Sequence, residues 1–118
     1  MRFPRIGGWT EVETGQSLLT NIHAAKVFWQ RLLGLQFASS LPDDTGVLLK
    51  DCRSIHTFWM RFPIDVIFLD EDYCVVETHE AVRPWRIAVP KAKTVRHVLE
   101  SNPGVSRKLR IGIRTRIE

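Results

Sequence analysis

The fold is decided by one stretch near the middle of the chain, Ser54-Ile-His-Thr-Phe-Trp-Met-Arg-Phe-Pro-Ile-Asp-Val-Ile-Phe-Leu-Asp70. Its first half, residues 54–61, is dense in β-branched and aromatic residues, which is typical of a strand. Its second half, residues 64–69, is apolar except at Asp65, which predicts a strand covered on both faces. Turn-forming residues follow at 70–73 and strand character resumes at 74–78, so we expect residues 63–79 to form an antiparallel hairpin.

Patterns on either side extend the β prediction. Residues 9–14 alternate and residues 47–49 are an apolar run, and both predict strands. Residues 94–100 favour a strand over a helical turn because of their β-branched residues. The best helix candidate begins at Thr20 or Asn21, either of which can cap it, and runs at helical spacing to a glycine stop at Gly34.

The last run of the chain, residues 108–117, alternates between apolar and basic residues. This pattern predicts a half-buried strand whose outer face carries Lys108, Arg110, Arg114 and Arg116. One short helix and six or more short strands together predict a mainly β fold. We expect a compact antiparallel β-sandwich or partly closed barrel that forms a single domain over residues 1–118.

Composition narrows the class of protein. A chain of 118 residues with 44% hydrophobic and 25% charged residues fits one globular domain. No uncharged apolar run reaches the roughly 18 residues of a membrane span, and residues 1–8 lack the apolar core of a secretory signal. We therefore expect a cytoplasmic monomer without a membrane partner.

The net charge of +4 is unevenly distributed along the chain. Lys and Arg against Asp and Glu number five to four in residues 1–50, two to seven in 51–80 and ten to two in 81–118. The three segments therefore carry +1, −5 and +8. If the acidic and basic segments are neighbours in space, the charges compensate one another internally and do not indicate a polyanionic partner.

The hairpin stretch also concentrates the residues that could form a binding site. His56, Phe58 and Met60 share one face of the expected strand. Trp59 and Trp85 each lie close in sequence to an arginine and could form aromatic and cationic walls for a planar or anionic ligand. The residues that we expect to line a pocket are His56, Phe58, Met60, Arg61, Asp65, Trp85 and Arg86. Ordinary packing of arginine over the aromatic rings remains the alternative.

Asp65 needs a partner, because leaving a carboxylate alone in an apolar strand costs several kcal/mol. Arg61 is the nearest candidate in sequence, and Arg53 and Arg86 are more distant ones. Two interpretations remain open at this point: a structural buried pair, or a polar position in a pocket.

Two other functional classes stay open. An enzyme could use Cys52, His56 and Asp65 for nucleophilic catalysis if the strands fold back on each other, although no known cysteine-enzyme signature surrounds Cys52. The two cysteines, Cys52 and Cys74, otherwise fit reduced, half-buried thiols. His56 and Met60 would lie about 13–14 Å apart on one strand, so we expect no metal site there and no cofactor.

Nucleic-acid binding by the basic C-terminal run is the third class. Interleaved cations can neutralise phosphates, but the basic face carries no aromatic residue on which bases could stack. A solvated edge strand whose charges prevent aggregation explains the same pattern, so we expect nucleic acid not to be the partner.

The stretch from Ser54 to Asp70 closely resembles the signature of the domain-of-unknown-function 192 family of bacteria and archaea. Supporting matches lie upstream at Arg31-Leu-Leu-Gly-Leu35 and downstream at Pro84-Trp-Arg86, Val98-Leu-Glu100 and Gly104. The resemblance spans most of residues 9–117. It implies a compact, mostly β barrel or sandwich with a short helix, and it implies no established activity. The sequence as a whole predicts a small module that binds an anionic or planar molecule or a peptide.

Overall fold

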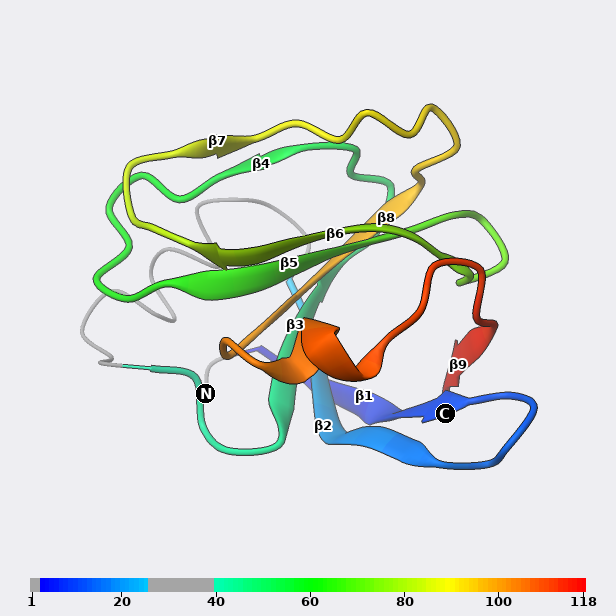
Figure 1. Cartoon of the computed structure of the whole chain (residues 1–118). Coiled ribbons are helices and arrows are strands. Elements are labelled where there is room, and N and C mark those ends of the chain that lie inside the picture. Colours follow the sequence, from blue (N-terminus) through cyan, green and yellow to red (C-terminus); the bar gives the residue numbers. More distant parts are fainter. Residues whose placement is uncertain (1–2, 26–39) are drawn as a thin grey trace.

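The computed structural model describes residues 3–25 and 40–118 of the chain. Within these ranges it contains nine strands and one short 3-10 helix, η1 (Figure 1). Their bounds are β1 Arg5–Glu11, β2 Ser17–Ala24, β3 Thr45–Leu49, β4 Ile55–His56, β5 Ile64–Leu69, β6 Val75–Val82, β7 Ile87–Ala88, β8 His97–Ser101, η1 Val105–Lys108 and β9 Thr115–Ile117. The predicted mainly β class is confirmed.

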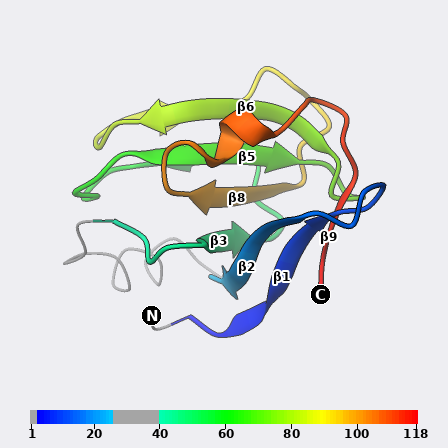
Figure 2. The ribbon, with the colours of Figure 1, turned by 60° about the horizontal axis from the view of Figure 1, so that its bottom comes forward.

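Seven strands form one curved sheet in the order β6-β5-β8-β3-β2-β1-β9, which can be followed in Figure 2. Strands β2 and β3 run parallel, and all other neighbouring pairs of this sheet run antiparallel. The sheet is therefore mixed. The short strands β4 and β7 pair with each other and form a small second sheet that lies along β5 and β6 in Figure 1.

The large sheet does not close into a barrel in the described part of the chain, but its two outer strands meet at one end. An isolated bridge joins Cys74 and Arg114, which directly precede β6 and β9. The Val75 amide donates to the Ile113 carbonyl at 3.0 Å, and the Thr115 amide donates to the Tyr73 carbonyl at 3.2 Å. These bonds hold the sheet in a curved shape.

Strand β5 is buried on both faces, as its sequence predicts, because it separates two hydrophobic clusters. The first cluster lies on the face covered by the small sheet and includes Val47, Leu49, Ile55, Met60, Ile64, Val66, Phe68, Ala88 and Val98. The second cluster lies on the other face and includes Trp9, Leu19, Ile22, Leu48, Ile67, Leu69 and Leu99. Alternate residues of β3, β5 and β8 point into the two clusters in turn.

The predicted hairpin is confirmed: β5 and β6 pair antiparallel around a turn at residues 70–74. The strand at 54–61 is mostly wrong, since only Ile55–His56 forms β4 and the chain then turns. Trp59 has φ 70°, outside the β region, and the chain turns at residues 58–59.

The predicted helix is wrong at its beginning. Residues 20–24 belong to β2, which pairs with β1 and β3. Ile22 is buried in the second cluster and Ala25 in the first, so the helical spacing of these two residues reflects burial on opposite faces of a sheet. The remainder of the predicted helix, residues 26–34, lies outside the described residues.

The predicted C-terminal strand is also largely wrong, because only Thr115–Ile117 forms β9. Lys108 ends η1, and Gly112, with φ 95°, lies in a turn at residues 111–112 that breaks the run. Leu109 and Ile113 still pack against the second cluster. Leu109 directly follows η1 and Ile113 directly follows the turn at 111–112. The alternation of apolar and basic residues therefore reflects burial of these two side chains and not a long strand.

Candidate interaction site

The small sheet presents one buried face and one outward face. In its register Ile55 lies opposite Ala88, and His56 lies opposite Ile87. Ile55 and Ala88 are buried in the first cluster, whereas Ile87 is 66% exposed. The alternation of β4 and β7 therefore directs His56 and Ile87 away from the core.

Thr57 organises the two loops beside this sheet. Its hydroxyl donates to the Arg83 carbonyl at 2.6 Å and accepts from the Arg86 amide at 2.8 Å. Its backbone amide donates to the Arg86 carbonyl at 2.8 Å, and its carbonyl accepts from the amides of Trp85 at 3.0 Å and Met60 at 3.2 Å. One buried threonine thus fixes the turn at 57–60 against the loop at 83–86.

Four rings, one from the end of β4 and three from these two loops, form a continuous aromatic chain. The ring centroids of His56 and Phe58 are 4.5 Å apart, and those of Phe58 and Trp85 are 5.8 Å apart in a stacked arrangement. Trp59 meets Trp85 edge to face at 4.7 Å. Trp59 is 60% exposed and Trp85 is 52% exposed, so these large rings are displayed to solvent.

Both tryptophans have a backbone conformation that L-residues rarely adopt. The φ angle is 70° at Trp59 and 65° at Trp85. A left-handed conformation at a bulky residue costs on the order of 1–3 kcal/mol and persists only where surrounding contacts impose it. The hydrogen bonds of Thr57 supply those contacts, and such strain is concentrated at functional positions in proteins.

The two chain segments that carry these four rings contain basic residues and no acidic ones. Residues 53–64 and 81–93 contain no Asp or Glu. Their charged residues are Arg53, Arg61, Arg83, Arg86, Lys91 and Lys93, all of them exposed. We use the name aromatic-cationic surface for the rings of His56, Phe58, Trp59 and Trp85, the exposed side chains of Ile87 and Val89, and the arginines Arg61, Arg83 and Arg86.

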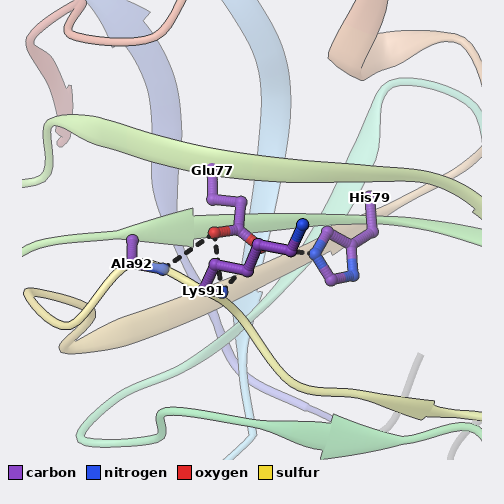
Figure 3. A network of polar contacts seen from close by, with 4 residues as sticks. All are labelled: Glu77, His79, Lys91 and Ala92. Carbon is purple, nitrogen blue, oxygen red and sulfur yellow. Dashed lines mark hydrogen bonds and ion pairs between the residues drawn. The ribbon is translucent and has the colours of Figure 1, made fainter.

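A polar network holds the small sheet in place (Figure 3). The Glu77 carboxylate on β6 accepts from the amides of Lys91 at 2.9 Å and Ala92 at 2.9 Å, in the loop that follows β7. Nε2 of His79 lies 2.5 Å from the same carboxylate. Burial raises the pKa of Glu77, but the hydrogen bonds from Ala92, His79 and Lys91 outweigh it and place the pKa below its ordinary value.

The structure separates the residues expected to line a pocket into two groups. His56, Phe58, Trp85 and Arg86 lie together around the two loops. Met60 is buried in the first cluster and Asp65 is fully buried in β5, so neither is displayed at the surface. Arg61 is exposed on the turn next to Met60.

Asp65 is held by backbone amides and a hydroxyl. Its Oδ1 accepts from the Ala81 amide at 2.8 Å. Its Oδ2 accepts from the amides of Gly104 at 3.0 Å and Ser106 at 2.9 Å and from the Ser106 hydroxyl at 2.8 Å. Asp65 therefore ties β6 and the start of η1 to β5, and these donors provide the pairing that the sequence assigned to an arginine.

The arrangement does not assemble the Cys52, His56 and Asp65 group. Asp65 has the same parity on β5 as Ile67 and Leu69, which face the second cluster. Cys52 packs against the first cluster, on the opposite face of the sheet, where its thiol donates to the Ser54 carbonyl at 3.1 Å. At the second cysteine, burial together with Asp70 and Asp72 raises the pKa of the Cys74 thiol, which lowers its thiolate fraction.

Three further observations concern metals, membranes and nucleic acids. The described ranges hold no group of three His, Cys, Asp or Glu side chains placed to bind a metal ion. Nor does any helix within residues 3–25 or 40–118 have the length and apolarity to span a membrane. Several C-terminal arginines face carboxylates: Arg110 lies 3.5 Å from Glu11, Arg114 2.9 Å from Glu13 and Arg116 2.8 Å from Glu118.

Sequence reasoning identified Trp85 and Arg86 but missed Thr57, Ile87 and Val89. Thr57 looked like one more β-branched residue of a strand, and its partners lie 26 and 29 positions away. The exposure of Val89, 62%, has no local signal because it depends on the pairing of β7 with β4.

Comparisons with known proteins are consistent with this architecture. The model of the DUF192 family, described as an uncharacterised group, matches residues 10–118. A UPF0127 protein of Pyrococcus horikoshii is 36% identical over 92 residues, which cover 75% of this chain and 78% of the relative. A UPF0127 protein of Pyrococcus furiosus is 32% identical over 110 residues, which cover 91% and 93%.

Two crystal structures share the fold. A protein of unknown function from Novosphingobium aromaticivorans superimposes with a TM-score of 0.74 at 21% identity, covering 92% of this chain and 83% of that one. A putative transcription regulator from Sinorhizobium meliloti gives a TM-score of 0.78 at 22% identity, covering 99% and 96%. At this level of identity the likeness concerns the fold alone.

Proposed function

The chain belongs to the DUF192 family of uncharacterised proteins, and on that premise we propose that it is an interaction module that binds an acidic, apolar peptide segment of a partner protein. The binding site in this proposal is the aromatic-cationic surface. One observation carries it: two tryptophans, each more than half exposed, are held in left-handed conformations within segments that contain cations and no carboxylate.

The exposed side chains favour a peptide over other anionic ligands. Trp59 and Trp85 can pack on prolines or aromatic side chains, and the arginines beside them attract carboxylates. Ile87 and Val89 extend the apolar area, and aliphatic side chains do not offer a flat ring on which a nucleobase can stack. No residue of the aromatic-cationic surface lines either of two cavities formed elsewhere by the described residues.

The rigidity of the surface also supports binding. The network of Thr57 fixes both loops before a partner arrives, so less side-chain and loop entropy is lost on association. Met60 and Asp65 are outside the proposed surface, and they hold the turn and the hairpin beneath it.

Selection of twelve-residue peptides by phage display on the immobilised protein tests the proposal. We expect enriched peptides to combine Glu or Asp with Pro, Leu or aromatic residues. Their synthetic versions should bind at least tenfold more weakly to the Trp59→Ala and Trp85→Ala variants, since central aromatic residues dominate such interfaces. The affinity for wild-type protein should also fall as salt rises.

The matched control is Ile111→Ala, which removes a side chain that is 64% exposed outside the aromatic-cationic surface. This variant should bind the peptides as the wild type does. Equal loss in the control and the tryptophan variants would refute the proposal. So would tighter binding of an oligothymidylate at the same tryptophans, which would assign the surface to single-stranded nucleic acid instead.

A further inference from the structure

A cavity of about 480 Å³ lies at one end of the large sheet, away from the aromatic-cationic surface. Strands β2, β3, β5 and β9 end there, and β1 begins there. The turn between β5 and β6 brings Tyr73 to the same end. The cavity therefore occupies the mouth of the partly closed sheet, a common position for ligand sites in β proteins.

The walls of this cavity are mainly apolar. Ile6, Ala24, Leu48 and Ile117 come from four different strands and line it. Leu48 belongs to the second cluster, and Ile117 packs against the same cluster, so the floor of the cavity is continuous with the hydrophobic interior. Ala24 has the same parity on β2 as Ile22, and its small side chain leaves space that a larger residue would fill.

Polar groups lie at the rim. Lys50 and Tyr73 both line the cavity, and Lys50 is exposed to solvent. Asp51 is the other charged residue of the lining, and the Arg96 guanidinium donates to its carboxylate at 2.7 Å. The hydrogen bond from Arg96 holds the pKa of Asp51 below its ordinary value. Arg96 neutralises the charge of Asp51. The ammonium of Lys50 therefore gives the rim a net charge of +1.

The ring of Tyr73 is held in place from behind. It meets the ring of His97 edge to face at 4.8 Å. His97 is buried, and its Nδ1 accepts from the Asp51 amide at 3.1 Å. Since His97 binds the backbone of Asp51 and packs on Tyr73, it connects two residues of the rim. This support makes the polar side of the cavity a fixed structure of the fold.

We propose that the cavity binds a compact organic acid, with its apolar body against Leu48 and Ile117 and its single carboxylate at Lys50 and the Tyr73 hydroxyl. An apolar enclosure of this size with one cation and one hydroxyl at its rim suits a monocarboxylic acid built on a ring or a branched chain. This site is independent of the peptide-binding surface proposed above, and either can fail without the other.

Two probes that share a naphthalene ring but carry either a charged or a neutral oxygen group test the proposal. Wild-type protein labelled with ¹⁵N is titrated with 2-naphthoate and with 2-naphthalenemethanol, and amide shifts are followed by NMR. We expect 2-naphthoate to bind more tightly and to shift the amides of Lys50, Tyr73 and Ile117. In Lys50→Gln its affinity should fall about tenfold, while the neutral alcohol binds as before, because one charge-assisted contact has been removed.

Two further variants locate the site. Ala24→Leu should weaken both probes at least fivefold, since it fills the apolar part of the cavity. Lys91→Gln, which removes an exposed lysine beside β7, should leave both affinities unchanged. Lys50 is exposed, so its substitution remains informative even if Ala24→Leu does not fold.

Three results would each overturn the proposal. The first is the absence of binding by either probe to the wild-type protein. The second is an equal effect of Lys50→Gln on both probes, which would show that Lys50 does not recognise the carboxylate of the ligand. The third is a set of shifts confined to the indole groups of Trp59 and Trp85, which would place the probes on the other surface.

Discussion

At Asp65 a single carboxylate collects four hydrogen bonds from two segments that follow it in the chain, β6 and the start of η1. The amide and hydroxyl donors of Gly104 and Ser106 converge on the same oxygen atom. Hydrogen bonds to an ionised acceptor are about twice as strong as neutral ones, so this residue has a large effect on stability for its size.

We expect Asp65→Asn to lower the free energy of unfolding by about 3 kcal/mol. The amide side chain removes the charge and directs donor hydrogens at backbone donors, which leaves buried groups unsatisfied. Urea denaturation followed by tryptophan fluorescence measures the change. Asp72→Asn, in the exposed turn between β5 and β6, is the matched control and should change stability by less than about 0.5 kcal/mol. A loss below about 1 kcal/mol at Asp65 would contradict this role.

Glu77 links one element to another, because it fixes the loop after β7 to β6. Its pKa is lower in the folded protein than in the unfolded chain. A depressed carboxylate contributes stability that is present above the unfolded pKa of about 4.3 and is lost as pH falls through the folded pKa. The attachment of the small sheet should therefore weaken in acid.

We expect Glu77→Gln to destabilise the protein by about 1 kcal/mol at neutral pH, and the difference from wild type should shrink as pH falls below about 4.3. Hydrogen exchange should accelerate at the amides of Lys91 and Ala92, which donate to this carboxylate. Glu71→Gln, exposed in the turn, is the control. A stability gap that stays constant between pH 7 and pH 3 would show that the charge of Glu77 has no such role.

Some secondary-structure elements could be predicted from the sequence and others could not. Strand β5 was predictable because its apolar residues on both faces match two separate hydrophobic clusters. The second half of β2, residues 20–24, was predicted as the start of a helix, because burial of Ile22 and Ala25 on opposite faces imitates helical spacing. The turn after β4 was missed because its shape comes from Thr57, whose hydroxyl contacts residues in a distant loop.

The candidate site could likewise be predicted only in part from the sequence. The aromatic and basic composition of residues 58–61 and 85–86 is visible in the sequence, and it is the basis on which a binding site was predicted there. Which side chains face solvent depends on the pairing of β4 with β7 and on the burial of Met60 and Asp65. The exposure of these side chains is set by tertiary structure, so no local sequence pattern predicts it.

The shape of the whole molecule depends on the contact between the two outer strands of the large sheet. The Thr115 hydroxyl donates to the Tyr73 carbonyl at 2.6 Å, next to the backbone bond between the same residues. Thr115 is buried, so the loss of its hydroxyl leaves that carbonyl with fewer donors.

We expect Thr115→Val, which preserves side-chain shape, to lower the free energy of unfolding by about 1–2 kcal/mol. Hydrogen exchange should accelerate at the amides of Val75 and Thr115 and stay unchanged at β8. Thr94→Val, at an exposed position, serves as the control. Uniform acceleration across all strands would mean that the two edges do not open separately from the rest of the sheet.

The pairing of β1 with β9 has a consequence for how fast the chain reaches its native state. The Arg114 side chain beside β9 binds Glu13, which lies 101 positions earlier in the sequence. Such a contact forms only after most of the intervening chain has been ordered, because closing a long loop is entropically unfavourable until other contacts support it. We therefore expect folding in the range of milliseconds to seconds that is typical of β proteins with distant pairings, with the β1–β9 contact among the later ones to form.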